Sequence, residues 1–320
     1  MGVHRCRMCS ADSVINMRQH RLALCEVHFV EWVEKITFSF IKKHRMFEPD
    51  DRILVAVSGG KDSLSLWRIL LKLGFQADGL YLDLGIEAGC SYSKRSGEYV
   101  EKFAQNISPK VKVHVLDLAD IYGKTVPEMA GRRKGGRKKS CSVCGLVKRH
   151  EMNRVARELG YTVIATGHNL DDEAAVLFGN VLHWEAEYLV RQSPVLPADG
   201  VGLVKRAKPL ARFYERETAA YAIINNIEYM QEECPYSVGA TSLRLKEVLN
   251  SMENSSPGTK LQFYFSFLRA KENSLFPGCK RPELRACEKC GQATGALGLC
   301  AFCRLLEPAS AHHKELEDEI

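Results

Sequence analysis

Apolar residues recur at two different spacings along this chain of 320 residues. In the segment 26–43 they fall three or four positions apart, the spacing that predicts an amphipathic helix. From residue 52 onward, short apolar runs alternate with segments of helical spacing. The strands predicted in this way are 52–57, 77–84, 111–116 and 161–166, and the helices are 63–73, 91–105, 146–159 and 171–182.

Strands that alternate with helices predict an α/β fold in which helices cover both faces of a parallel sheet. In such sheets ligands bind beside the carboxyl ends of the strands. The following segment, 192–210, contains Pro194, Pro197 and Pro209 and is expected to form loops. Helices are expected to resume at 214–225, 242–252 and near 260–269.

The same pattern, with the positions of the cysteines, predicts the domain organisation. A metal module is expected at each end of a catalytic core. The expected units are an N-terminal module 1–30, a linking helix 31–50, a catalytic domain 51–275, a C-terminal module 284–306 and a polar tail 307–320.

Composition narrows the class of protein. The chain is 45% hydrophobic and 26% charged, as in soluble globular proteins, and no apolar run is long enough to cross a bilayer. No secretory leader is visible, so we expect a cytoplasmic protein. Cysteines in a reducing compartment are more often metal ligands or catalytic groups than disulfides. The twelve cysteines therefore call for metal or redox chemistry.

Positive charge is concentrated just before Cys141. Six of the nine residues in 131–139 are cations, namely Arg132, Arg133, Lys134, Arg137, Lys138 and Lys139. Such a run can be a solvated loop. Beside a reactive site it is also what a polyanionic substrate requires. We expect it to contact nucleic-acid phosphates.

A glycine-containing loop connects the first predicted strand of the sheet to a helix. Glycines there let the backbone approach a ligand, and amides at the helix start favour phosphate. The loop is not a Walker A motif, because Val55 stands where that motif needs glycine and Asp62 stands where it needs Ser or Thr. The expected nucleotide-binding residues of the loop are Ser58, Gly59, Gly60, Lys61, Asp62 and Ser63.

Two further segments end predicted strands and are expected at the same edge of the sheet. The first is residues 81–85, which include Leu82. Residues 165–173 contain Gly167, Asp171 and Asp172. The paired carboxylates could hold Mg²⁺ against pyrophosphate, since Mg²⁺ binds few carboxylates plus phosphate oxygens. They could also be capping residues of the following helix, and the two roles are compatible.

Two cysteine clusters have the spacing of structural zinc sites, in which two short chelate loops supply four ligands to a tetrahedron. His20 is a competing fourth ligand at the first site. The expected ligands are Cys6, Cys9, Cys25 and His28 in the first site, and Cys287, Cys290, Cys300 and Cys303 in the second.

A third set of cysteines differs, because Cys141 and Cys144 have no second pair nearby and Cys234 is far along the chain, before Pro235. Their chemistry allows two interpretations. One is a [4Fe-4S] cluster with three protein ligands and one open iron. The other is a redox site with a disulfide or persulfide. We expect Cys90 and Cys279 to be structural or incidental.

Taken together, these motifs resemble the tRNA 2-thiolation enzymes of the PP-loop superfamily, the N-type ATP pyrophosphatases with a Rossmann-like sheet. The similarity is greatest to those that sulfurate 5-methyluridine at position 54 in the T-loop. The segments that carry it are 58–63, 167–172, the three cysteines and the two terminal zinc patterns. The resemblance implies that ATP, as Mg-ATP, adenylates O2 of the uridine with release of pyrophosphate. Sulfur then replaces the activated oxygen. The resemblance also implies that the strand end at residues 81–85, which include Leu82, receives the adenine.

The resemblance also implies roles for individual residues and partners. Cys141, Cys144 and Cys234 would hold a [4Fe-4S] cluster that carries sulfide on its open iron. The sulfur would come from a ubiquitin-like carrier protein with a C-terminal thiocarboxylate. Lys148, one helical turn after Cys144, would neutralise an oxyanion, and Asp172 would act as acid–base or metal ligand. The zinc modules would recognise tRNA shape, and the enzyme would be a homodimer.

Three alternatives remain at this stage. The same chemistry could act on a wobble uridine or on a cytidine. A PP-loop ligase would use ATP without sulfur transfer, and its three cysteines would bind zinc or nothing. An RNA-binding protein with a degenerate nucleotide fold is the third, and the intact segment 58–63 argues against it.

Overall fold

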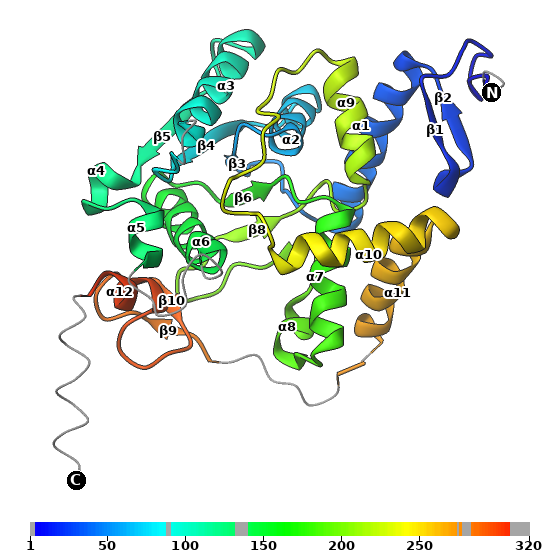
Figure 1. The fold of residues 1–320 in the computed structure, drawn as a ribbon. Helices are drawn as coiled ribbons and strands as arrows, with labels where there is room; N and C mark the ends of the chain where they lie inside the picture. The colour runs from blue at the N-terminus through cyan, green and yellow to red at the C-terminus, as the bar shows by residue number, and fades with distance from the viewer. Residues whose placement is uncertain (1–3, 88–90, 132–139, 274, 277–282, 308–320) are drawn as a thin grey trace, which may run out of the picture.

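A computed structural model gives the fold (Figure 1), and the structure describes residues 4–87, 91–131, 140–273, 275–276 and 283–307. At its centre lies a six-stranded sheet in the order β5-β4-β3-β6-β8-β7. The first five strands in this order run parallel, and β7 pairs with β8 in the antiparallel sense. The strands are β3 (Ile53–Val57), β4 (Ala77–Asp83), β5 (Val113–Asp117), β6 (Val163–Thr166), β7 (Val195–Leu196) and β8 (Lys205–Ala207).

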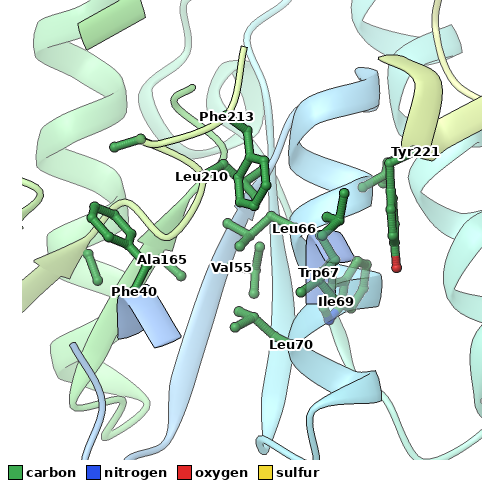
Figure 2. Close-up of a cluster of buried hydrophobic side chains, with 14 of the residues drawn as sticks. Phe40, Val55, Leu66, Trp67, Ile69, Leu70, Ala165, Leu210, Phe213 and Tyr221 are labelled. Carbon is green, nitrogen blue, oxygen red and sulfur yellow. The ribbon is translucent and has the colours of Figure 1, made fainter. Parts of the chain in front are cut away.

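Alternate residues of the central strands enter two different cores. From β3, Ile53, Val55 and Val57 enter the first core, whereas Leu54 enters the second. This follows from the two-residue repeat of a strand, which sends successive side chains to opposite faces. Figure 2 shows part of the first core, where Val55 lies among Trp67 and other large side chains.

Helices cover both faces, as the alternating pattern predicted (Figure 1). The first core receives side chains from α1 (Glu26–Lys43), α2 (Lys61–Lys72), α3 (Tyr92–Ile107), α7 (Leu170–Leu182), α9 (Glu215–Ile224) and α11 (Thr259–Glu272). The second core receives them from α4 (Leu118–Tyr122), α5 (Val126–Gly131), α6 (Ser140–Glu158) and α12 (Ala301–Leu306). Helix α10 (Thr241–Ser255) packs against α7, and α8 (Ala186–Arg191) follows α7.

The two terminal modules lie on opposite sides of the core (Figure 1). The N-terminal module pairs β1 (Ile15–Met17) with β2 (Leu22–Leu24) around the 3-10 turn η1 (Arg18–His20). The C-terminal module pairs β9 (Arg285–Ala286) with β10 (Ala293–Thr294) and ends in α12. Among the described helices, none combines the length and apolar character that a bilayer span requires.

The predicted fold class is confirmed, and so are its four main strands. The segment 192–210 is loop-rich, as predicted, but it also contains two short strands, β7 and β8, that were not predicted. These strands are two and three residues long, and β8 is Lys-Arg-Ala, so neither has an apolar run long enough to predict a strand. Helix α6 begins at Ser140 rather than at residue 146, and α4, α5 and α8 were not predicted. The domain boundaries remain a prediction, and residues 308–320 of the tail lie outside the described part.

Candidate active site and metal centres

A cleft of about 420 Å³ opens at the carboxyl edge of the sheet. Its walls come from the ends of β3, β4 and β6, from α6, and from the segment before α10. This is the position at which parallel sheets bind ligands. Predicted site residues that line it are Ser58, Asp62, Ser63, Leu82, Cys144, Lys148, Gly167, Asp172 and Cys234.

The nucleotide loop depends on Gly59 for its conformation. Gly59 has φ +75°, and a Cβ there would lie 2.5 Å from the backbone oxygen of Ser96. Glycine tolerates both conditions, and other residues do not. The Ser58 N–H donates to Ser63 Oγ at 3.1 Å, and Ser63 Oγ donates to the oxygen of Gly60 at 3.0 Å. The loop is thereby folded tightly over the start of α2, whose free amides face the cleft.

Lys61 lies beside the loop and is held by carboxylates. Its Nζ is 2.8 Å from Glu215 Oε1 and 3.2 Å from Asp62 Oδ2. Burial acts to lower the pKa of Lys61, but Asp62 and Glu215 raise it overall, so the ammonium is charged. Glu215 on α9 was not predicted as a site residue. Only the fold brings it near the loop, 154 positions away in sequence.

Asp171 and Asp172 are adjacent in sequence but have different surroundings. Asp171 is buried, pairs with Lys260, and accepts the N–H of Glu215 at 2.8 Å. It is not among the residues that line the cleft. Asp172 does line the cleft and pairs with Lys246 at 2.6 Å. The structure therefore does not bring the two carboxylates together as one cleft-facing pair.

Asp172 instead shares the cleft wall with Asp62 of the nucleotide loop. The pKa of Asp62 is raised, first by burial and then by the negative charge of Asp172, against the stabilising contacts of Lys61 and Thr218. Two neighbouring carboxylates repel each other when both are charged, and a bound cation reduces this repulsion. This pairing was not predicted, because the two residues are 110 positions apart and belong to different motifs.

The α7 start is fixed by a capping box between Asn169 and Asp172. Gly167 precedes it at a point where a Cβ would come within 2.8 Å of the Ser63 backbone nitrogen. His168 also lines the cleft, and its Nδ1 is 2.8 Å from Thr166 Oγ1. Desolvation by the cleft walls lowers the pKa of His168, which favours the neutral ring. His168 stands within the segment 165–173 but was not predicted to have a role of its own.

The third set of cysteines converges from two distant segments. Cys144 and Cys234 both line the cleft, and Cys141 Sγ lies 3.4 Å from the backbone oxygen of Tyr236, two residues after Cys234. All three are free thiols. The pKa of Cys141 is raised, first by burial and then by Cys144 and Cys234, while Lys148 lowers it. The fold thus places three thiols and one ammonium group at one end of the cleft.

These three sulfurs do not form a group tight enough to surround one ion among the described residues. In an iron–sulfur cubane each cysteine binds a different iron, so its sulfurs stand farther apart than around a single zinc. The donor set therefore fits a multinuclear cluster better than a mononuclear site. Free, cleft-facing thiols on two segments are the arrangement that such a cluster requires.

The first terminal cluster has the geometry of a zinc site. Zinc–sulfur bonds of about 2.3 Å give tetrahedron edges of roughly 3.8 Å. Cys9 Sγ and Cys25 Sγ are 3.8 Å apart, and His28 Nδ1 is 3.2 Å from Cys25 Sγ and 3.6 Å from Cys6 Sγ. His20 is not in this group and pairs with Glu217 at 3.1 Å instead. The four predicted ligands therefore fit one zinc ion.

The second terminal cluster fits the same ion. The ligand atoms of its four cysteines all lie within 4.8 Å of one another, and Cys290 Sγ is 3.8 Å from Cys300 Sγ. Burial acts to raise the pKa of Cys287, but backbone N–H groups of Cys300, Cys290 and Lys289 lower it to about 6. Metal binding needs the thiolate, and these amides favour it. All ligand positions are occupied by protein, so both clusters are structural in type.

The C-terminal module packs on α6, the helix that carries Cys141, Cys144 and Lys148. Gln292 Nε2 donates to the oxygen of His150 at 3.1 Å, and Asn153 Nδ2 donates to Gln292 Oε1 at 3.2 Å. The ring of Phe302 also lies against His150. The module therefore supports the helix that presents the thiols, a role beyond the predicted recognition of tRNA shape.

The six cations of 131–139 cannot be placed in the same way. Arg132, Arg133, Lys134, Arg137, Lys138 and Lys139 all lie outside the described residues, as do Cys90 and Cys279. Their predicted roles stay predictions. The described chain ends at α5 before this run and resumes at α6, which carries Cys141 and Cys144.

Comparisons with known proteins agree with this geometry. Residues 5–30 match the family described as 2-thiouridine synthetase TtuA, N-terminal LIM domain, and residues 51–185 match the tRNA methyl transferase HUP domain. The chain is 50% identical to the tRNA-5-methyluridine(54) 2-sulfurtransferase of Thermus thermophilus, over 94% of this chain and 90% of that protein. It is 42% identical to the protein of the same name from Thermotoga maritima, over 94% and 95% of the two chains.

A solved structure has the same fold. It is the U34-tRNA thiolase NcsA from Methanococcus maripaludis with its [4Fe-4S] cluster, which matches with a TM-score of 0.77 at 22% identity. The match covers 95% of this chain and 96% of that one. At this identity the likeness concerns the arrangement of helices and strands.

Proposed function

This chain belongs to the TtuA-type family of tRNA-5-methyluridine(54) 2-sulfurtransferases, and we propose a residue-level mechanism for its thiolation of tRNA. It is an ATP-dependent PP-loop enzyme whose reaction is the 2-thiolation of 5-methyluridine 54 in tRNA. The observation that carries the proposal is the shared cleft, in which Ser58 of the nucleotide loop, Cys144 and Cys234 all line one cavity.

Two parts of the cleft would bind ATP, the nucleotide loop and the apolar wall beside it. Leu82, near the end of β4, would offer an apolar surface for the adenine. Amides at the start of α2 and the hydroxyl of Ser58 would donate to the phosphates. O2 of the uridine attacks the α-phosphorus and pyrophosphate leaves, so a poor leaving group becomes AMP. A sulfur nucleophile then attacks C2 and AMP departs, which leaves 2-thio-5-methyluridine.

Positive charge near the reacting atoms would come from Lys148 on α6. Its place in the cleft wall, one helical turn after Cys144, supports a role in neutralising the α-phosphate or the oxyanion that develops during attack. Lys61 already forms ion pairs with Asp62 and Glu215, so its role would be to hold the nucleotide loop in place. We assign the direct electrostatic role to Lys148.

The carboxylates Asp62 and Asp172 are the candidate Mg²⁺ ligands. Mg²⁺ is commonly bound by one or two carboxylates together with substrate phosphates. Both residues line the cleft, whereas Asp171 is engaged with Lys260. When the ion binds, Asp172 would exchange its pairing with Lys246 for the metal, and the repulsion between the two carboxylates would be relieved.

Cys141, Cys144 and Cys234 would hold the [4Fe-4S] cluster. When bound, this group supplies a soft, open iron position suited to carrying sulfide. The chain's own contribution is to present three free thiols, from two separate segments, at one end of the cleft. We further propose a ubiquitin-like carrier with a C-terminal thiocarboxylate as sulfur donor, and a homodimer as the working assembly.

The test is a nucleoside analysis of tRNA from cells that lack this chain. Loss of 2-thio-5-methyluridine, with its return on expression of the wild-type chain, is the expected result. Loss of wobble 2-thiouridine alone would contradict the target, and unchanged thionucleosides would contradict thiolation altogether. Anaerobic purification followed by an absorption spectrum tests the cluster separately, since a colourless, iron-free active enzyme would exclude it.

A further inference from the structure

The first turn of α9 makes contacts with two different parts of the molecule. It consists of the consecutive residues Glu215, Arg216, Glu217 and Thr218. Glu215 and Thr218 bond to the nucleotide loop. Arg216 and Glu217 bond to the N-terminal module. Helix α9 accordingly packs against both α1 and α2 (Figure 1). Neither Arg216 nor Glu217 has a part in the chemistry described above.

The contacts with the nucleotide loop reach both charged residues of that loop. Glu215 Oε1 is 2.8 Å from Lys61 Nζ, and the hydroxyl of Thr218 donates to Asp62 Oδ1. Glu215 and Thr218 are three positions apart, so they lie on one face of the helix. Asp62 also lines the cleft. A shift in this turn of α9 would therefore move the side chains that hold Lys61 and Asp62 in place.

The contacts with the N-terminal module converge on the carboxylate of Glu217. This side chain is fully buried, and Gln19 Nε2 donates to its Oε1 at 2.6 Å. His20 Nε2 lies 3.1 Å from the same oxygen. The other oxygen, Oε2, accepts the N–H of Tyr214 at 2.9 Å, which caps the start of α9. Both contacts with Oε1 thus come from η1, the turn between the two strands of the module.

Gln19 and the first turn of α9 bind each other in both directions. The Gln19 nitrogen donates to Glu217, and the Gln19 oxygen accepts from the guanidinium of Arg216. Arg216 also donates to the backbone oxygen of Asn16 at 3.4 Å. A buried carboxylate is costly unless hydrogen bonds replace the water that it has lost. Without Gln19, Glu217 would lack a donor, and we expect the first turn of α9 to shift.

The later part of α9 is bonded in the same two directions. The Tyr221 hydroxyl donates to Glu34 Oε1 at 3.1 Å, and Glu34 lies on α1, the helix that follows the module. At the end of α9, Asn225 Oδ1 accepts from Arg68 Nε at 3.1 Å, and Arg68 lies on α2, the helix that begins at the nucleotide loop. Helix α9 therefore connects the N-terminal part of the chain to the nucleotide loop.

We propose that Gln19 is a positioning residue for the nucleotide loop and acts through Glu217 and α9. This inference rests on the proposed role of the loop in binding ATP. The N-terminal module then contributes to ATP binding, in addition to the predicted recognition of tRNA shape. No atom of the module needs to touch the nucleotide, because Glu215 and Thr218 transmit its effect to Lys61 and Asp62.

Binding of an ATP analogue in the absence of tRNA tests this role. The probe is α,β-methylene ATP with Mg²⁺, which cannot be cleaved between these two phosphates, and the full chain is titrated with it by calorimetry. Gln19→Ala should weaken binding about tenfold, since a hydrogen bond to a buried charged group is lost. Glu217→Gln is the conservative variant. It keeps one acceptor for its two donors and should weaken binding about threefold.

The double variant shows whether Gln19 acts through Glu217. In the Glu217→Gln background, Gln19→Ala should weaken binding of the analogue by less than about threefold, because its partner is already altered. A full tenfold effect in that background would overturn the proposal, since the two effects would then be independent.

Arg18→Ala is the matched control, since Arg18 is exposed on the same turn, η1. It should bind the analogue as the wild type does, and the metal content of Gln19→Ala should equal that of the wild type. Equal weakening in Arg18→Ala and Gln19→Ala, or no weakening in Gln19→Ala, would overturn the proposal. Loss of metal from Gln19→Ala would also overturn it, because unfolding of the module would then explain the effect.

Steady-state thiolation separates this role from recognition of tRNA. Gln19→Ala should raise KM for ATP about tenfold, with kcat and KM for tRNA within about twofold of the wild type. A raised KM for tRNA with normal binding of the analogue would overturn the proposal and assign the module to tRNA alone. A wild type that binds the analogue but thiolates no tRNA would instead contradict the proposed function and leave this inference in place.

Discussion

His150 of α6 stacks face to face on Phe302 of the C-terminal metal module, with ring centroids 3.7 Å apart and an interplanar angle of 16°. Phe302 lies between two zinc ligands, Cys300 and Cys303, and His150 lies two residues after Lys148. The C-terminal metal module therefore packs directly against the helix that carries the reactive thiols. Through this contact, a metal ion bound in the module would influence the active site without any part in the reaction.

Phe302→Ala should loosen that helix. Phe302 is 2% exposed, so the substitution should lower the free energy of unfolding by about 3–5 kcal/mol. We expect iron content after reconstitution to fall as well, because Cys141 and Cys144 lose their support. Chemical denaturation and iron analysis measure the two effects. Leu297→Ala, at a site 79% exposed in the same module, should change neither, and a normal iron content in Phe302→Ala would break the proposed link.

Cys234→Ala should abolish cluster binding while the fold survives. Cys234 is only partly buried and lies in a segment between helices, so truncation leaves no large cavity. We expect unchanged far-ultraviolet circular dichroism, loss of iron and loss of tRNA thiolation. The measurement is iron per chain after anaerobic reconstitution. Normal iron content in this variant would remove Cys234 from the ligand set.

Gly59→Ala should block ATP use. The added Cβ would meet the Ser96 backbone oxygen at 2.5 Å, in a backbone conformation with φ +75°. The nucleotide loop must then shift, and we expect AMP formation to fall at least a hundredfold. Gly74→Ala is the matched control, because Gly74 has φ +84° but nothing within 4 Å of the new atom. It should cost about 1–2 kcal/mol of stability and leave AMP formation intact. Similar activity losses in both variants would refute the steric argument.

Acid should destabilise the protein partly through Glu151. This carboxylate is fully buried; burial acts to raise its pKa, but bonds from His150, Tyr122 and Arg154 lower it overall. The unfolded chain then binds the proton more readily, so this contribution to stability is complete above the ordinary pKa of about 4.3 and is lost as pH falls through the lower folded value.

Glu151→Gln should therefore flatten the dependence of stability on pH below about 4.3, and it should cost about 1–3 kcal/mol at neutral pH by leaving donors unpaired. Unfolding curves recorded across that acid range measure both. Glu158→Gln is the control, since Glu158 also pairs with Arg154 but is 55% exposed at its side chain. An unchanged pH profile in Glu151→Gln would show that other carboxylates govern acid unfolding.

Replacing the six cations of 131–139 by glutamine should weaken tRNA binding and flatten its salt dependence. Each cation that no longer binds a phosphate lowers the slope of log affinity against log salt by roughly 0.7–0.9. ATP binding without tRNA should persist, because the nucleotide loop is a separate segment. Titration of tRNA at several salt concentrations is the measurement. Unchanged affinity would make this run a solvated loop.

The sequence by itself determined the fold class, both metal modules and the nucleotide loop. Each of these depends on residues that are close together in the chain. The signals are the alternation of strand and helix patterns, the Cys-x-x-Cys spacings and the six consecutive residues 58–63. Such patterns can be recognised without knowledge of the fold, because the residues that interact are near one another in the chain. Cys9 and Cys25 of the first metal site are an example. The strand β8 was missed because it is only three residues long and mostly polar, so no apolar run marks it.

Only the tertiary structure decided which side chains share the cleft. It separated Asp171 from Asp172, set Asp172 beside Asp62, and held Lys61 with Glu215. These relationships join residues that are far apart in the chain, or separate residues that are adjacent. They depend on how helices pack on the sheet, which no local spacing encodes.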